Sequence, residues 1–224
     1  MEPFTIAAIA GAAWLALKKK QADAQVQGLD NALVVTGATP AARIASIAKL
    51  YASVIKSEAA RLAIPEAAAA AVISIESGGK GFGSDGKLLI RFEPATFKKY
   101  TDKSVSDSHK NQAAEYAAFA QAAGIDEDAA YKSISMGAGQ IMGFNAKRIG
   151  YPSAKAQFAA FSSSLQAQLI GMFEFIRTDA KLIKAARSGD WTTFAIHYNG
   201  SGQKGYDQKL AAATSLYPQN ANVA

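Results

Sequence analysis

Glu76 is the residue whose type and position most directly suggest catalysis. It ends the apolar run 67–75 and shares a helical face with Val72 and Ile73, three and four positions earlier. A carboxyl group on such a stripe loses contact with water, so we expect its pKa to rise, as a general acid working near neutral pH requires. Ser77 and the glycines after it would open space beside it. From spacing alone, a glutamate facing water at a helix end is an equal alternative.

Two further segments carry side chains suited to binding a sugar. In SMGAGQIMGFN (135–145), Gln140 lies among glycines, where the backbone can approach a ligand closely. In HYNGSG (197–202), Tyr198 and Asn199 come at an expected helix end, before a flexible loop. A tyrosine ring packs well on a pyranose face, while hydroxyl and amide groups bond its polar atoms. These residue types favour a carbohydrate ligand.

The composition excludes several other chemistries. The chain has no cysteine, which rules out thiol nucleophiles and disulfides, and its two histidines, His109 and His197, are far apart in sequence. GGKGFG lacks the spacing of a phosphate-binding loop. The net charge of +6 favours an anionic partner, but the lysines are scattered without interleaved aromatics. We therefore expect no cofactor, no metal and no nucleic-acid partner, and assign the charge to a cell wall or membrane.

The elements that must position these residues are mostly helices. Of the 224 residues 49 are alanine, which suits close helix packing. Thr39-Pro40 predicts the start of a helix that runs to about residue 62, and Pro65-Glu66 starts the helix that carries Glu76. The best strand candidate is 88–93. Further helices are predicted at 94–100, 110–123, 127–134, 137–149, 153–161, 163–178, 180–188, 190–198 and 205–216. The fold class is mainly α, with a small β-element after the Glu76 helix.

The first twenty residues form an apolar segment that ends in Lys18–Lys20. Three interpretations remain open: a membrane anchor or membrane contact through residues 4–20, a helix buried against protein, and a cleaved signal peptide. The polar stretch 21–39 has the composition of a linker. We expect a catalytic domain at 40–217 and a tail at 218–224.

Several segments, taken together, resemble the phage and bacterial N-acetylmuramidase family. They are IESGGKGFGSDGKLLIRFEPATF, SMGAGQIMGFN, the Asp190-Trp191 pair, FAIHYNG and YDQKL, spread over about 40–217. The pattern is also similar to goose-type lysozymes and soluble lytic transglycosylases. The resemblance implies a lysozyme-like α+β fold, with Glu76 as the catalytic acid and Gln140, Tyr198 and Asn199 in the cleft around N-acetylmuramic acid. Two positions depart from the family pattern: Ala95 stands where a histidine is usual, and Leu165 where an acid is usual.

Glycosidases usually pair the acid with a second carboxylate that acts as nucleophile or base. The candidates are Glu93, at the end of the expected strand, and Asp85, in the glycine-rich loop. We favour Glu93 because the resemblance includes its Phe-Glu pair. However, Glu93 could equally begin the next helix, and Asp85 could be a turn residue.

The expected function is that of a phage-encoded endolysin, which hydrolyses the β-1,4 bond between N-acetylmuramic acid and N-acetylglucosamine in peptidoglycan. If neither carboxylate activates water, the acetamido group of the substrate could assist, giving a lytic transglycosylase with the same Glu76. A third alternative is a non-enzymatic virion or membrane-associated protein that keeps the fold. The expected location is the bacterial cell envelope, in the periplasm or at the membrane, or else a virion.

Overall fold

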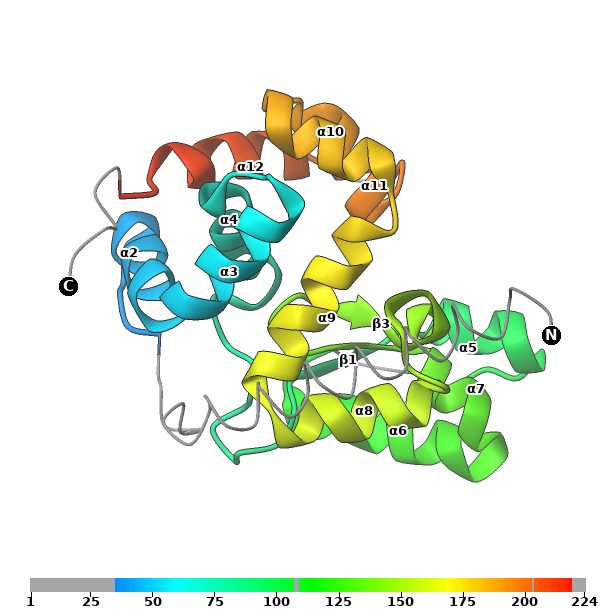
Figure 1. Cartoon of the computed structure of the whole chain (residues 1–224). Coiled ribbons are helices and arrows are strands. Elements are labelled where there is room, and N and C mark those ends of the chain that lie inside the picture. Colours follow the sequence, from blue (N-terminus) through cyan, green and yellow to red (C-terminus); the bar gives the residue numbers. More distant parts are fainter. Residues whose placement is uncertain (1–34, 107–108, 203, 219–224) are drawn as a thin grey trace, which may run out of the picture. The chain divides into compact units, whose positions relative to one another are not determined.

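The computed structural model describes residues 35–106, 109–202 and 204–218. Figure 1 shows its elements in two groups, joined by the helix α9 (Leu165–Arg177), which packs against both. The helical group holds α2 (Pro40–Leu50), α3 (Ala52–Leu62), α4 (Glu66–Ser77), α10 (Ala180–Ser188), α11 (Trp191–Asn199) and α12 (Tyr206–Ser215). The sheet group holds β1 (Ile90–Phe92), α5 (Pro94–Thr101), α6 (Gln112–Ile125), α7 (Glu127–Lys132), β2 (Ile134–Met136), β3 (Ile141–Met142), the 3₁₀ turns η1 (Gly143–Asn145) and η2 (Lys147–Ile149), and α8 (Ala154–Ser163).

Helix α4 is the central element of the helical group. Its residues 68–74 are all buried, and it packs against α2, α3 and α12. The run of alanines allows this, because small side chains let neighbouring helices approach from several sides. The helix ends at Gly78, whose φ of 64° is left-handed, and the amide of Gly79 donates to the carbonyl of Ile73 (3.1 Å). The Tyr51 hydroxyl donates to the carbonyl of Gly79 (2.5 Å), so the backbone after the helix is fixed from outside.

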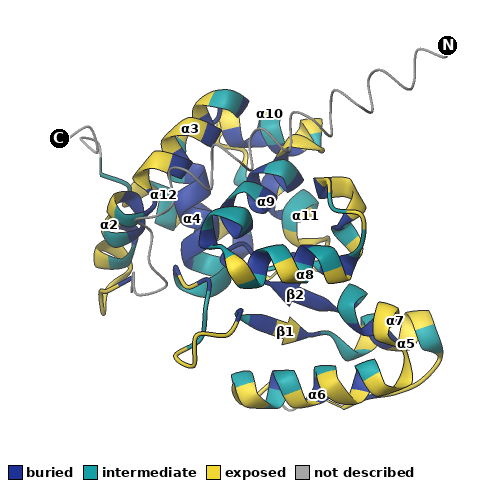
Figure 2. Ribbon diagram, turned by 60° about the horizontal axis from the view of Figure 1, so that its bottom comes forward, coloured by how far each residue is buried: buried dark blue, intermediate teal, exposed yellow. Residues whose placement is uncertain are grey.

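The sheet is small, antiparallel and ordered β1-β2-β3. Helix α6 runs along the free edge of β1 (Figure 2). Its side chains bond to the backbone of that strand in place of a further strand. Gln112 both accepts from the amide of Ile90 (3.0 Å) and donates to its carbonyl (2.6 Å). The carboxylate of Glu115 accepts from the amide of Phe92 (2.7 Å). These bonds hold the strand that leads into Glu93.

The mainly helical fold with a small sheet confirms the predicted fold class, but the prediction of a helix at 137–149 is wrong. That segment forms the β2–β3 turn, strand β3 and two short 3₁₀ turns. Glycines explain the difference: Gly137 has a φ of 71°, and a side chain at Gly143 would collide with the carbonyl of Tyr131. The apolar spacing in this segment reflects burial in an irregular turn rather than a helical face.

Two details at the start of the domain also differ from the sequence prediction. The helix predicted over 40–62 is interrupted at Tyr51, whose buried side chain is tied to Gly79. Within the stretch predicted as linker, Val35 is buried in the core and faces Gly79. Thr39 caps α2 as predicted, because its hydroxyl accepts from the amide of Ala42 (3.2 Å).

The apolar segment 1–20 and most of the predicted linker and tail lie outside the described residues. Among the residues that the structure describes, no helix has the length and apolar character needed to cross a membrane.

Candidate active site

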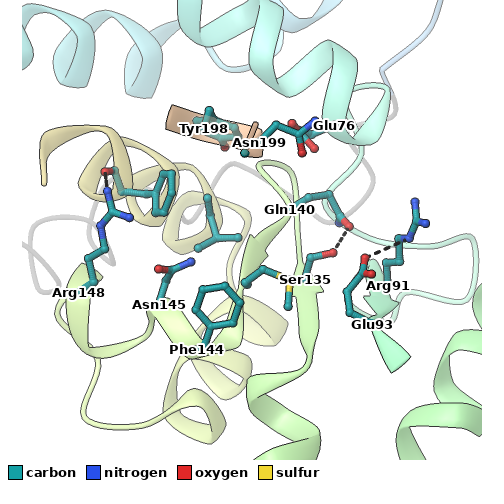
Figure 3. A pocket seen from close by; sticks show the side chains of 14 residues that line it. Glu76, Arg91, Glu93, Ser135, Gln140, Phe144, Asn145, Arg148, Tyr198 and Asn199 are labelled. Atoms are coloured by element: carbon teal, nitrogen blue, oxygen red, sulfur yellow. Dashed lines mark hydrogen bonds and ion pairs between the residues drawn. The ribbon is translucent and has the colours of Figure 1, made fainter. Parts of the chain in front are cut away.

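A pocket of about 440 Å³ lies between the helical group and the sheet group. One wall, which we call the acid wall, is formed by Glu76 at the end of α4 and by Tyr198 and Asn199 at the end of α11. The opposite wall, the sheet wall, carries Arg91, Glu93, Ser135, Gln140, Met142, Phe144, Asn145 and Arg148 (Figure 3). The five residues predicted from sequence, Glu76, Glu93, Gln140, Tyr198 and Asn199, therefore all line one pocket.

The carboxyl group of Glu76 is mostly removed from water. Burial raises its pKa from the usual 4.5 to about 7, while a hydrogen bond donated by the Tyr206 hydroxyl acts in the opposite direction. Near neutral pH a substantial fraction of this group therefore carries a proton that it can donate. The alternative of a solvent-facing glutamate at a helix end does not describe this residue.

Aromatic rings support the acid wall from behind. Tyr198 lies nearly parallel to Phe194 (centroids 5.6 Å apart) and to Tyr206 (6.3 Å), and its edge contacts Phe175. The Tyr198 hydroxyl donates to the carbonyl of Gly139 in the β2–β3 turn (2.8 Å). The ring was expected to pack on a sugar face, yet in this structure its neighbours are protein rings and its hydroxyl holds the β2–β3 turn.

The β2–β3 turn presents Gln140 to the pocket in a constrained conformation. Its φ of 47° is unusual for a residue other than glycine. Its side-chain oxygen accepts from Ser135 (2.8 Å), and its amide group donates to the carbonyl of Gly137 (2.9 Å). Buried Gln168 of α9 braces the same turn by accepting from the amide of Ala138 (2.9 Å). The side chain is thus held in place before any ligand arrives.

Glu93 lies on the sheet wall, in an environment unlike that of Glu76. Its carboxylate is partly exposed and forms an ion pair with Arg91 (3.2 Å). Its side chain does not cap α5, although the residue occupies the N-cap position. Asp85, the other candidate for the second carboxylate, accepts from the amide of Lys87 (3.1 Å) as a turn residue and does not line this pocket.

Comparison with known proteins agrees with this geometry. The chain matches the N-acetylmuramidase family over residues 65–218. The chain belongs to this family. It is therefore a glycosidase that degrades peptidoglycan. The crystal structure of the Burkholderia AP3 phage endolysin is similar to the muramidase, with a TM-score of 0.64 and 31% identity over 77% of this chain and 76% of that chain. No curated protein matches the chain.

The muramidase departs from the family pattern at two positions, and neither lines the pocket. Leu165 is buried at the start of α9, close to Gly81 of the glycine-rich loop. Ala95 is exposed in the first turn of α5.

The sequence analysis singles out neither Tyr206, which bonds to Glu76, nor several lining residues of the sheet wall, among them Arg148. Tyr206 lies 130 positions after Glu76, and only its place in YDQKL, within the family resemblance, gives a signal. Arg148 lies in the segment 137–149, for which the sequence predicts a helix, and that pattern does not indicate that its side chain lines the pocket. His197 lies outside the pocket lining and bonds to Asp179 (2.8 Å), the N-cap of α10.

Proposed function

We propose that the muramidase is a phage endolysin that hydrolyses the β-1,4 bond between N-acetylmuramic acid and N-acetylglucosamine, with Glu76 as the general acid. The observation that carries this proposal is the desolvated carboxyl of Glu76, with its pKa near 7, at the edge of a pocket with polar residues on the opposite wall. The likeness to the AP3 phage endolysin supports the phage origin.

In the proposed reaction, Glu76 donates its proton to the glycosidic oxygen as the bond to the muramic acid C1 breaks. The sugar then passes through an oxocarbenium-like state, and water adds to C1 and loses a proton. Gln140 and Asn199 bind polar groups of the sugar. Tyr198 positions the turn that carries Gln140, because its hydroxyl is bonded to the carbonyl of Gly139.

We assign Glu93 as the second carboxylate, which accepts the proton from the attacking water. It lines the same pocket as Glu76, but on the opposite wall. One observation favours a different outcome: its carboxylate is already paired with Arg91 (3.2 Å). If this pair persists with substrate bound, the acetamido oxygen of the muramic acid attacks C1 as the glycosidic bond breaks. The C6 hydroxyl of the same sugar then displaces that oxygen from C1 and loses its proton to the deprotonated Glu76, and the enzyme is a lytic transglycosylase.

The test is the Glu76→Gln substitution, measured on purified peptidoglycan. Loss of a general acid lowers kcat by about 10²–10⁴-fold, and we expect a loss in that range. Glu66→Gln is the matched control, because Glu66 lies on the same helix and also accepts a tyrosine hydroxyl, that of Tyr217 (2.8 Å), but outside the pocket. Undiminished activity of Glu76→Gln would refute the assignment.

Mass spectrometry of the products separates the two reactions. New reducing ends are expected from hydrolysis, and 1,6-anhydro ends from transglycosylation. Glu93→Gln should suppress hydrolysis strongly, while leaving any anhydro products in place. If Glu93→Gln releases reducing ends at the normal rate, Glu93 is not the base.

We further propose that residues 1–20 act in delivery rather than in chemistry. The linker that follows at 21–39 gives up its last residues, from Val35 on, to the catalytic domain, whose predicted range is 40–217, and the tail is 218–224. The apolar stretch and the lysines after it support membrane contact in the cell envelope, and attachment to a virion is the alternative. Flotation with lipid vesicles, comparing the full chain with one lacking residues 1–20, tests this. Equal flotation of both would contradict it.

A further inference from the structure

Arg148 holds a fixed position at the end of the pocket away from Glu76 (Figure 3). Its guanidinium carbon lies 4.0 Å from the centre of the Phe175 ring. Its Nε donates to the Thr178 hydroxyl (2.6 Å), and one terminal nitrogen donates to the carbonyl of Phe175 (3.4 Å). A long, exposed side chain is thus ordered by three contacts, so less entropy remains to be lost when it binds a ligand.

The charge of Arg148 is not balanced within the described part of the chain. No carboxylate of the described residues lies within 4.0 Å of its guanidinium, whereas Arg91, the other cation of the pocket, is paired with Glu93. Thr178 and the Phe175 carbonyl are neutral acceptors, and they leave donors of the guanidinium unused. The two arginines of the pocket therefore differ, and only Arg148 is available to an anion.

The substrate offers one kind of anion. The sugar rings and their acetamido groups are neutral, and the negative charge lies on the lactyl group of muramic acid or on the stem peptide attached to it. A planar guanidinium matches a carboxylate in shape and charge. Building on the proposed function, we propose that Arg148 binds a carboxylate of the muramic acid substituent and so determines the preference for peptidoglycan over neutral glycans.

The test compares two forms of one glycan that have the same glycosidic bonds. One keeps its carboxylates, and in the other they are converted to methylamides. We expect Arg148→Gln to lower kcat/KM about tenfold on the first form, mainly through KM, and to leave the second form within twofold of the unsubstituted enzyme. Arg148→Glu should extend the loss on the anionic glycan only, and high salt should reduce the difference between the two forms.

Lys147→Gln is the matched control, because Lys147 is an exposed neighbouring cation that does not line the pocket. It should leave both forms unaffected. Arg148→Lys keeps the charge and should recover part of the loss. Two arms separate the sources of the carboxylate: glycan with its stem peptides, and glycan from which an amidase has removed them to leave the free lactyl group.

An equal loss on both glycan forms, or no loss on the anionic form, would overturn the proposal. An equal loss would indicate that Arg148 only supports the fold through Phe175. The result is independent of the proposed role of Glu76, because Glu76→Gln should abolish cleavage of both forms alike. If Glu76→Gln cleaves normally, the proposed function fails instead.

Discussion

The two walls of the pocket place the same type of residue in opposite environments. On the acid wall, Glu76 is desolvated, its pKa is about 7, and its polar partner is the neutral hydroxyl of Tyr206. On the sheet wall, Glu93 is partly exposed and paired with the positive charge of Arg91. The same residue type is therefore desolvated beside a neutral partner on one wall, and partly solvated beside a cation on the other.

The walls also differ in what holds them. The acid wall is built from regular helices, α4 and α11, supported by stacked rings. The sheet wall is built from short strands and turns, held by close backbone approach and by buried amides such as that of Gln168. We therefore expect substitutions in the sheet wall to act through backbone geometry, and those in the acid wall to act through protonation.

The largest effect should come from Gly143→Ala in the sheet wall. A Cβ at this buried residue would lie 1.9 Å from the carbonyl oxygen of Tyr131, and backbone cannot move aside cheaply. We expect a loss of about 4 kcal/mol or more in the free energy of unfolding, measured by urea denaturation. Gly78→Ala, at the end of the Glu76 helix, is the comparison, because its Cβ would meet nothing within 4 Å.

At Gly78 only the left-handed φ of 64° opposes a side chain, which costs about 1–2 kcal/mol. If the two alanine substitutions destabilised the protein equally, the proposed difference in how the walls are held would be wrong.

The second-largest effect should be a pH-dependent gain in the free energy of unfolding when Glu76 is replaced by glutamine. Because burial raises the pKa of Glu76 from 4.5 to about 7, the native state binds a proton more tightly than the unfolded chain. The charged form thus destabilises the native state, so stability is lost as pH rises from about 4.5 to 7. Glu76→Gln removes this penalty and should stabilise the protein by about 3 kcal/mol above pH 7, with no gain below pH 4.

Thermal unfolding at several pH values measures this difference. Glu93→Gln is the matched substitution on the sheet wall, where removal of an exposed ion pair should change stability by about 1 kcal/mol or less. If Glu76→Gln does not raise the free energy of unfolding at high pH, the Glu76 carboxyl of the unsubstituted protein is better solvated than the structure indicates.

The sequence predicted residues with local signals and missed those that depend on distant packing. Glu76 and Gln140 were found because an apolar stripe and flanking glycines are visible within a few positions. Their placement in one pocket comes from packing of α4 against elements far along the chain. Tyr206 and Arg148 have no such local signal, because their roles depend on Glu76 and Phe175, which are distant in sequence.

The same distinction applies to the fold. The predicted helices lie close to the observed ones wherever caps such as Thr39 and Ser164 begin a regular run. The prediction failed at 137–149, where Gly137 and Gly143 allow turns that an apolar pattern does not reveal. It also missed the break at Tyr51, which accompanies a tertiary hydrogen bond to Gly79.

A smaller effect on the acid wall should follow from Tyr206→Phe. The Tyr206 hydroxyl lowers the pKa of Glu76, so its removal should raise that pKa further and move the alkaline limb of the pH–rate profile to higher pH. It also releases the carboxyl from a fixed orientation, and we expect kcat to fall about tenfold. Steady-state rates on peptidoglycan across the pH range measure both changes.

Tyr217→Phe is the matched control, because Tyr217, which follows the end of α12, donates its hydroxyl to Glu66 at the start of α4, outside the pocket. It should leave the pH–rate profile in place. A limb that moves to lower pH in Tyr206→Phe would mean that the hydroxyl does not act on Glu76 as described.

The smallest effect should come from Gln140→Gly on the sheet wall. The left-handed φ of 47° costs a non-glycine residue about 1–2 kcal/mol, and glycine removes that cost. The substitution also removes the hydrogen bonds to Ser135 and Gly137, so the two changes largely offset each other and stability should stay within about 1 kcal/mol of the unsubstituted protein. In the proposed function the amide binds substrate and moves no proton, so KM should rise about threefold to tenfold, the loss of one neutral hydrogen bond, while kcat and the pH–rate profile stay unchanged. A shift of the pH–rate profile would mean that Gln140 takes part in proton transfer. The proposed difference, with protonation controlled by the acid wall alone, would then be wrong.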